Sequence, residues 1–152
     1  MIQQLEQTLH TESPITKLLG ITALCYEDET LTLSAPLEAN INHKGTAFAG
    51  SINAVTTLAG WGLLWLLLQE AQLSAKIVIQ ESTIRYRRPI TQDMVATCRK
   101  PASERLEPFF VMVQRRGIAR LELQAHIWQG EHLAVEFSGR YVVSMRKEHM
   151  QK

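Results

Sequence analysis

The segment FAGSINAVTTLAGWGLLWLLLQEAQ, residues 48–72, decides the fold of this protein. It carries a single charged residue, Glu70, and its apolar residues occur on all sides of a helical projection instead of in one stripe. Helices of that kind are buried in a protein or span a membrane. The most apolar run, 58–68, is shorter than the roughly 20 residues that a bilayer span needs. We therefore expect a helix at the centre of a globular core.

The sequence on both sides of this helix alternates between apolar and polar residues with the period of β-strands. Ile21, Ala23 and Cys25 alternate with Thr22, Leu24 and Tyr26. The acidic turn 27–29 joins them to a second short strand, which leads into a loop over 36–47. Further strands are expected over 75–88, 94–100, 118–128 and 133–145. A short helix is expected over 103–116, with Ser103 as its cap and Gly117 as its end.

These elements predict an α+β fold in which a curved antiparallel sheet wraps around one long central helix. The 152 residues, 45% of them apolar, suit a single domain over 1–152. Within it, 1–19 form an N-terminal helical segment that breaks at Ser13 and Pro14.

The composition argues against several classes of function. Sixteen basic residues against fifteen acidic ones give a formal net charge of +1, which provides no field to attract nucleic acid or a membrane. Cys25 and Cys98 lie far apart without a C-x-x-C motif or a signal peptide, so we expect free thiols in the cytoplasm. The histidines have no metal-ligand spacing, and we expect neither a metal nor a cofactor. Four of them lie outside the loop described next: His10, His126, His132 and His149.

The loop that leads into the long helix reads NHKGTAFAG and ends at Gly50. It resembles the hot-dog-fold thioesterases, many of which carry N-x-x-G-x-x-H-G-G at this place. Asn42, Gly45 and Gly50 match that pattern, Phe48 stands where histidine is common, and Ala49 replaces the first glycine.

A closer resemblance is to the thioesterase-like family of the YiiD C-terminal type. It rests on the KGTAF run from Lys44, Ser51, the LAGWG segment 58–62, and YRRPI at 86–90 with Asp93. The resemblance covers roughly 14–145. It implies a hot-dog fold, a homodimer or dimer of dimers, and an acyl thioester of coenzyme A or of acyl carrier protein as the substrate.

Thioester hydrolysis requires hydrogen-bond donors where negative charge develops on the carbonyl oxygen. Backbone N–H groups at the start of a helix are unpaired and lie at its positive end. The resemblance places the thioester carbonyl at Ala49, Gly50 and Ser51, where Gly50 leaves room for its approach. Gly45 and Phe48 are expected to line the same substrate site. Ser51 is alternatively a helix cap.

In related hot-dog thioesterases a carboxylate seven residues after the last glycine activates water, and Thr57 occupies that position here. Threonine can orient water but cannot act as the base. His43 is the nearest titratable alternative, since imidazole changes charge near neutral pH. It is otherwise an ordinary loop histidine. Asn42 either holds a water or the substrate carbonyl, or caps the backbone of its own turn.

Substrate contacts further from the reacting bond are also expected. Arg85, Arg87 and Arg88, together with Lys44, are candidates for binding the phosphates of coenzyme A. Strand alternation places Arg85 and Arg87 on one face and Arg88 on the other. Trp61 is a candidate for an acyl pocket. Their alternative roles are to keep the sheet surface soluble and, for Trp61, to pack the core.

Three functions follow from these residues. The first is an acyl thioesterase, whose site forms between two protomers. The second is a non-catalytic module that binds acyl-CoA or acyl carrier protein, which the missing carboxylate at Thr57 favours. A hot-dog hydratase or dehydratase is disfavoured because we find no Asp/His or Glu/His pair of that kind, and the chain lacks a glycine loop for acetyltransferase chemistry.

Overall fold

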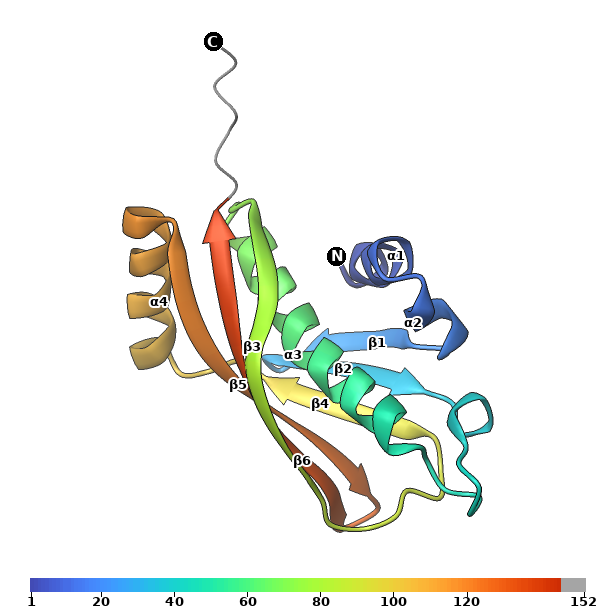
Figure 1. Ribbon diagram of the computed structural model, residues 1–152. Coiled ribbons are helices and arrows are strands. Elements are labelled where there is room, and N and C mark those ends of the chain that lie inside the picture. Colours follow the sequence, from blue (N-terminus) through green and yellow to red (C-terminus); the bar gives the residue numbers. More distant parts are fainter. Residues whose placement is uncertain (146–152) are drawn as a thin grey trace.

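The computed structural model describes residues 1–145 and contains four α-helices and six strands within that range (Figure 1). The residues beyond Met145, which include His149 and the end of the predicted domain, lie outside it. The elements are α1 (Ile2–Glu12), α2 (Ile15–Leu18), β1 (Thr22–Glu27), β2 (Thr30–Ala35), a short 3-10 turn (Glu38–Asn40), α3 (Ala49–Glu70), β3 (Ala75–Tyr86), β4 (Met94–Arg99), α4 (Ser103–Arg116), β5 (Ile118–Gln129) and β6 (His132–Met145).

The six strands form one antiparallel sheet in the order β1-β2-β4-β5-β6-β3. The sheet curves around α3, which contacts β2, β3, β4, β5 and β6 (Figure 1). The expected α+β hot-dog architecture is therefore confirmed. Although β3 follows the helix directly in the sequence, it lies at the edge of the sheet opposite β1.

Helix α3 is the centre of the core. Its length of 22 residues and mean hydropathy of 1.5 over its most apolar window would also suit a membrane span, but 67% of that window is buried inside the protein. Twelve of its residues are buried, among them Val55, Leu63 and Leu67. A helix that is apolar on all sides is stable only when it is covered, and here the sheet provides most of that cover.

The two edges of the sheet differ in how they are covered. Along β1, the Glu6 carboxylate of α1 accepts the Ala23 N–H at 2.8 Å, and the His10 imidazole contacts the Ile21 carbonyl oxygen at 2.7 Å. At the other edge, β3 pairs with β6 and with no second strand of the described chain. Val78 and Ile79 are exposed there. An uncovered edge strand with apolar side chains is a surface that can pair with another chain.

Helix α4 begins differently from the expectation. Ala102 occupies the N-cap position, Ser103 is the first helical residue, and no side chain caps this end, so the prediction of Ser103 as cap is wrong. An alanine N-cap is tolerated because the exposed first turn can bond to water. Gly117 ends the helix in the left-handed conformation with φ 72°, as predicted.

A tyrosine of β6 packs against the middle of α3. The Tyr141 hydroxyl donates a hydrogen bond to the Thr57 carbonyl at 2.6 Å, and its ring occupies the space where a Cβ atom of Gly60 would lie. Burial raises the pKa of the Tyr141 hydroxyl far above its usual range. Gly60 therefore allows a buried hydroxyl to join the sheet to the helix backbone.

We expect Gly60→Ala to lower the free energy of unfolding by about 2 kcal/mol, since the added methyl overlaps Tyr141 in a packed core. In an open helix the same change would stabilise by nearly 1 kcal/mol. Urea denaturation measures the difference.

The matched control is Gly50→Ala, where the overlapping group is the ring of Phe48. That ring is 55% exposed and can rotate away, so the stability should change little. Equal effects of the two substitutions would show that Tyr141 does not hold α3 as described.

Candidate active site at the amino end of the central helix

Asn42 organises the loop that leads into α3. Its amide oxygen accepts the backbone N–H groups of Lys44 at 2.9 Å and Thr46 at 3.1 Å. Its amide nitrogen donates to the Thr46 hydroxyl at 2.8 Å and to the Ala47 carbonyl at 3.3 Å. Gly45 adopts the positive φ of 77° that this tight turn needs. The side chain thus has the turn-capping geometry, and its hydrogen bonds hold the loop closed.

A second asparagine, Asn40, anchors this loop to the body of the protein. Its amide nitrogen donates to the carbonyls of Leu19 at 2.8 Å and Pro36 at 2.7 Å. Its own carbonyl accepts the Phe48 N–H at 2.7 Å, at the start of α3. Asn40 is buried, and its amide oxygen has no hydrogen-bond partner among residues 1–145. Sequence reasoning missed this residue because no motif distinguishes it from the other polar residues of the loop.

The amino end of α3 has no side-chain cap. Its N-cap residue is Phe48, whose carbonyl accepts the Ile52 N–H at 3.0 Å but whose side chain has no group that could accept a hydrogen bond from the helix. Ala49 and Gly50 are exposed, whereas Ser51 is buried and does not cap the helix. The first-turn N–H groups therefore remain available at the positive end of a 22-residue helix.

Two aromatic residues flank this helix end. The Phe48 ring lies against Gly50, in the space where a Cβ atom would otherwise be. The Tyr86 hydroxyl, from the end of β3, donates to the Ala49 carbonyl at 3.4 Å. The absence of a side chain at Gly50 therefore lets the Phe48 ring pack against the helix, a role that the sequence did not predict. The sequence showed Tyr86 only as part of the YRRPI run. Its contact with α3 arises because the sheet brings the end of β3 beside the amino end of the helix.

A polar pair continues along the same side of α3. The Thr57 hydroxyl donates to the Asn53 amide oxygen at 3.1 Å, and both residues are half-buried. The neighbouring Thr56 is buried and donates to the carbonyl of Ile52. Asn53 was missed, although its spacing of three residues from Gly50 and four from Thr57 places all three on one helix face. This face carries amide and hydroxyl groups but no carboxylate.

Beyond Thr57 lies a groove of about 890 Å³ between α1, α3 and β3. Leu58, Trp61 and Trp65 of α3 line it together with Ile77 of β3. The Trp61 indole N–H donates to the Ile77 carbonyl at 3.2 Å. Trp61 thus both lines a groove and joins the central helix to the edge strand.

Arg85 near the end of β3 and Arg87 just after the strand alternate with Tyr86, so their side chains point away from the amino end of α3. Arg87 forms an ion pair with Glu136 at 2.7 Å on the outer face of the sheet, and Arg85 pairs in register with the same glutamate. Tyr86 points the opposite way, toward α3. Within one protomer the structure therefore separates Arg85 and Arg87 from Gly50. Arg88 follows the strand and is exposed.

His43 and Lys44 directly follow Asn42 in the loop and are exposed. Neither side chain makes a hydrogen bond within the described chain. Their backbone positions are fixed by the closed turn of Asn42. The structure thus brings Asn42, His43, Lys44, Gly45 and Phe48 next to the start of α3 in one loop.

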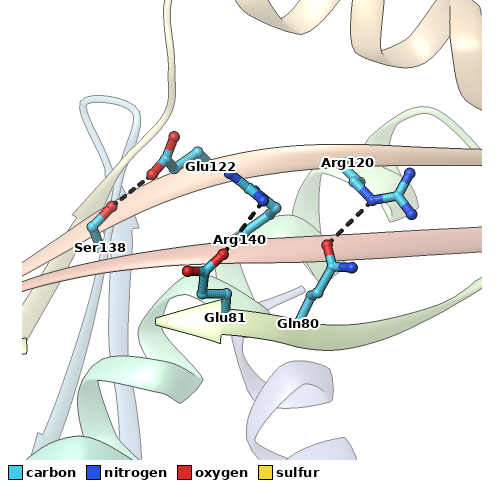
Figure 2. A network of polar contacts seen from close by, with 6 residues as sticks. All are labelled: Gln80, Glu81, Arg120, Glu122, Ser138 and Arg140. Carbon is cyan, nitrogen blue, oxygen red and sulfur yellow. Dashed lines mark hydrogen bonds and ion pairs between the residues drawn. The ribbon is translucent and has the colours of Figure 1, made fainter. Parts of the chain in front are cut away.

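Polar contacts cover the outer face of β3, β5 and β6 (Figure 2). The three pairs, at 3.2, 3.4 and 3.1 Å, are Arg120 with Gln80, Arg140 with Glu81, and Ser138 with Glu122. The first two pairs join β5 and β6 to β3 at its bulge between Ile79 and Glu81, and the third joins β6 to β5. The polar side chains of this face therefore hydrogen-bond or pair with one another, as is typical of a solvated surface.

The cysteines are separate from this site. Burial raises the pKa of the Cys98 thiol to about 12, so it stays protonated at neutral pH and is a core residue, not a nucleophile. Cys25 is a second free thiol, half-buried in β1. Residues 1–145 contain no cluster of three or more metal-ligating side chains.

Comparison with known proteins agrees with this architecture. The family model described as "Putative thioesterase (yiiD_Cterm)" matches residues 2–145, nearly the whole chain. The chain belongs to this family. The resemblance of its loop and helix motifs to the YiiD C-terminal type is thereby confirmed, and it supports a thioester hydrolase.

Three solved structures illustrate the relationship. A protein of unknown function from Chlorobaculum tepidum is 33% identical, with a TM-score of 0.90, over 95% of this chain and 94% of that one. A "putative thioesterase" from Shewanella oneidensis is 34% identical, with a TM-score of 0.83, over 95% and 97%. A thioesterase from Haemophilus influenzae, 17% identical over 99% and 95% with a TM-score of 0.74, shares the fold.

The Asn42 hydrogen bonds predict different effects for two substitutions. Asn42→Ala removes all four bonds and should lower the free energy of unfolding by about 1–2 kcal/mol. Asn42→Asp keeps the two bonds that the oxygen accepts and should retain slow hydrogen exchange at the Lys44 and Thr46 amides. Fast exchange of both amides in Asn42→Asp would contradict the assigned geometry.

Proposed function

We propose that this protein is an acyl thioesterase in which the amino end of α3 holds the thioester carbonyl. The observation that carries the proposal is the exposed, uncapped first turn at Ala49 and Gly50. Backbone donors there can stabilise the oxyanion of the tetrahedral intermediate without a charged side chain. Membership of the family supports the thioester as the substrate class.

The attacking water needs a position and a proton acceptor. Thr57 and Asn53 lie further along the helix face that starts at Gly50, and their hydroxyl and amide groups can orient a water. The imidazole of His43 is our candidate for the base, since its loop is adjacent to the helix end. Asn42, whose amide is engaged in the turn, serves the site by fixing the position of His43.

For the carrier, we propose coenzyme A or acyl carrier protein, with no other cofactor. Lys44 and Arg88 are exposed cations that can contact its phosphates. Arg85 and Arg87 face the outer side of the sheet, and Arg87 is engaged by Glu136, so they are weaker candidates within one protomer. The groove at Trp61 and Trp65 can receive an acyl chain.

We further propose that two copies associate through the edge of β3 and act in the cytoplasm. The exposed apolar residues Val78, Ile79 and Tyr86 lie along that edge, and pairing would cover its unpaired backbone groups. A two-fold dimer formed this way would bring the second protomer close to the amino end of α3, because Tyr86 already contacts Ala49.

The alternative is a binding module that holds an acyl thioester without hydrolysing it. One observation favours it, since α3 carries no carboxylate before Glu70 and Thr57 donates its hydroxyl proton to Asn53. Such a protein would bind acyl-CoA stoichiometrically without releasing free thiol.

The two functions are distinguished by a thiol-release assay over a series of acyl-CoA chain lengths. We expect turnover by the wild type, a loss of about 100-fold in kcat for His43→Ala, and full activity for Arg115→Ala, an exposed control in the last turn of α4. Saturable binding without turnover would replace the hydrolase by the binding module. Normal kcat in His43→Ala would remove the histidine from the mechanism.

Position 57 provides a test of the missing carboxylate. Thr57→Asp should raise kcat by at least about tenfold, because a carboxylate can take the proton from water where threonine cannot. Thr57→Val, which has nearly the same shape without the hydroxyl, should lower it. The proposed water position is contradicted if both variants have wild-type kcat and KM.

A further inference from the structure

A second cleft, of about 440 Å³, lies between β4, β5 and the start of α4. The cleft and the amino end of α3 lie at opposite ends of β4. The strand begins shortly after Ile90, whose carbonyl accepts the Ala47 N–H, and its last residue, Arg99, lines the cleft. The six residues of β4 span roughly 17 Å at the rise of a β-strand. Its lining is Thr30, Thr97, Arg99, Lys100, Pro101, Arg105, Glu122, Leu123, Gln124 and His126.

The cleft exists because β4 and β5 separate. They pair over three residues, from Ala96 with Ile127 to Cys98 with Ala125. Arg99 continues in register with Thr30 of β2 while the chain leaves β5. The side chains that alternate with the buried Ala96 and Cys98 therefore point outward into the opening.

Positive charge dominates the lining. Arg99, Lys100 and Arg105 contribute three cations, and His126 adds an imidazole. Glu122 is the single carboxylate of the lining, and it accepts a hydrogen bond from the Ser138 hydroxyl at 3.1 Å on the side of β6. Among residues 1–145, no carboxylate oxygen lies within 4.0 Å of a side-chain nitrogen of the three cations.

Several acidic residues near the cleft lie outside its lining. Glu136 pairs in register with His126 and forms an ion pair with Arg87 at 2.7 Å. Glu29, Glu70 and Glu107 face the cleft on the other side of Arg99, Lys100 and Pro101. They lower the net charge of the region but leave the lining of the 440 Å³ cleft with an excess of positive charge.

One of the cations is held in place by the backbone. The Arg105 guanidinium donates from Nη2 to the Glu122 carbonyl at 2.6 Å, which fixes it across the opening from β4. A guanidinium fixed by one of its five donors can present the others to an oxyanion with little further loss of side-chain entropy. The hydroxyls of Thr30 and Thr97 supply neutral donors in the same opening.

We propose that this cleft binds the phosphate group of a small phosphomonoester. Two guanidinium groups and an ammonium group match the charge and the several acceptor oxygens of a phosphate dianion. The volume accommodates a small polar molecule, and Gln124 and the two threonines can hydrogen-bond to its hydroxyl groups. Among residues 1–145 the lining contains no Phe, Tyr or Trp, and its neutral groups are hydrogen-bonding side chains that suit hydroxyl groups, so we commit to a phosphorylated sugar or polyol as the ligand class.

The test is titration of the full chain with ribose 5-phosphate, and separately with inorganic phosphate, followed by heteronuclear NMR and calorimetry. We expect saturable shifts at the Arg105 side chain and the His126 amide, and weakening of binding by about tenfold or more in Arg99→Gln and in Arg105→Gln. Arg115→Gln, an exposed arginine of α4 outside the cleft, is the matched control and should bind like the wild type.

Three outcomes would overturn the proposal. They are the absence of saturable binding, shifts spread over all exposed arginines, and equal weakening by Arg115→Gln and Arg99→Gln. Because Arg105→Gln also removes the bond to the Glu122 carbonyl, Arg99→Gln serves as the variant that leaves this contact intact. The thioesterase assay is independent of all these results, since none of the cleft residues belongs to the site at α3.

Discussion

The structure depends on the burial of one helix. The side chains of α3 are apolar on nearly all sides, so the helix is stable in water only when other elements cover it. The curved sheet covers most of it, α1 closes part of the remaining gap, and the Tyr141 hydroxyl joins the sheet to the helix backbone beside Gly60. The amino end is the exception. There the first-turn N–H groups need partners, and the side chain of Phe48 at the N-cap has no acceptor to offer them.

The loop before α3 converts that exposed end into a defined site. Asn40 ties the loop to the end of α2 and to Pro36, and Asn42 closes its turn through four hydrogen bonds. Phe48 then rests on Gly50, and Tyr86 approaches from the edge strand. The groups that hydrogen bonds fix at this helix end are amides and hydroxyls, which suit the stabilisation of an oxyanion. The proposed proton acceptor, His43, is exposed in the same loop.

Much of the fold could be predicted from the sequence, because the all-round apolar helix and the period-two strands follow from local patterns. The break at Ser13, the acidic turn and the end of α4 at Gly117 are also local features, and the structure confirms them. The predicted cap of α4 was wrong, because a serine near the start of a helix does not show whether it precedes the first turn or belongs to it. In the site, Gly50 and the loop could be found from motifs. The contacts of Asn40 and Tyr86, and the orientation of Arg87 toward Glu136, depend on strands that are distant in sequence, so local patterns could not show them.

In the proposed function, an acyl carbonyl binds to the backbone at the start of α3. The most direct measurement is the amide NMR spectrum of the protein with an acyl-CoA analogue in which a methylene group replaces the thioester sulfur. We expect the Gly50 and Ser51 amide protons to move downfield as they donate to the ketone oxygen, with smaller changes elsewhere. Saturation of binding with no change at these two amides would contradict it.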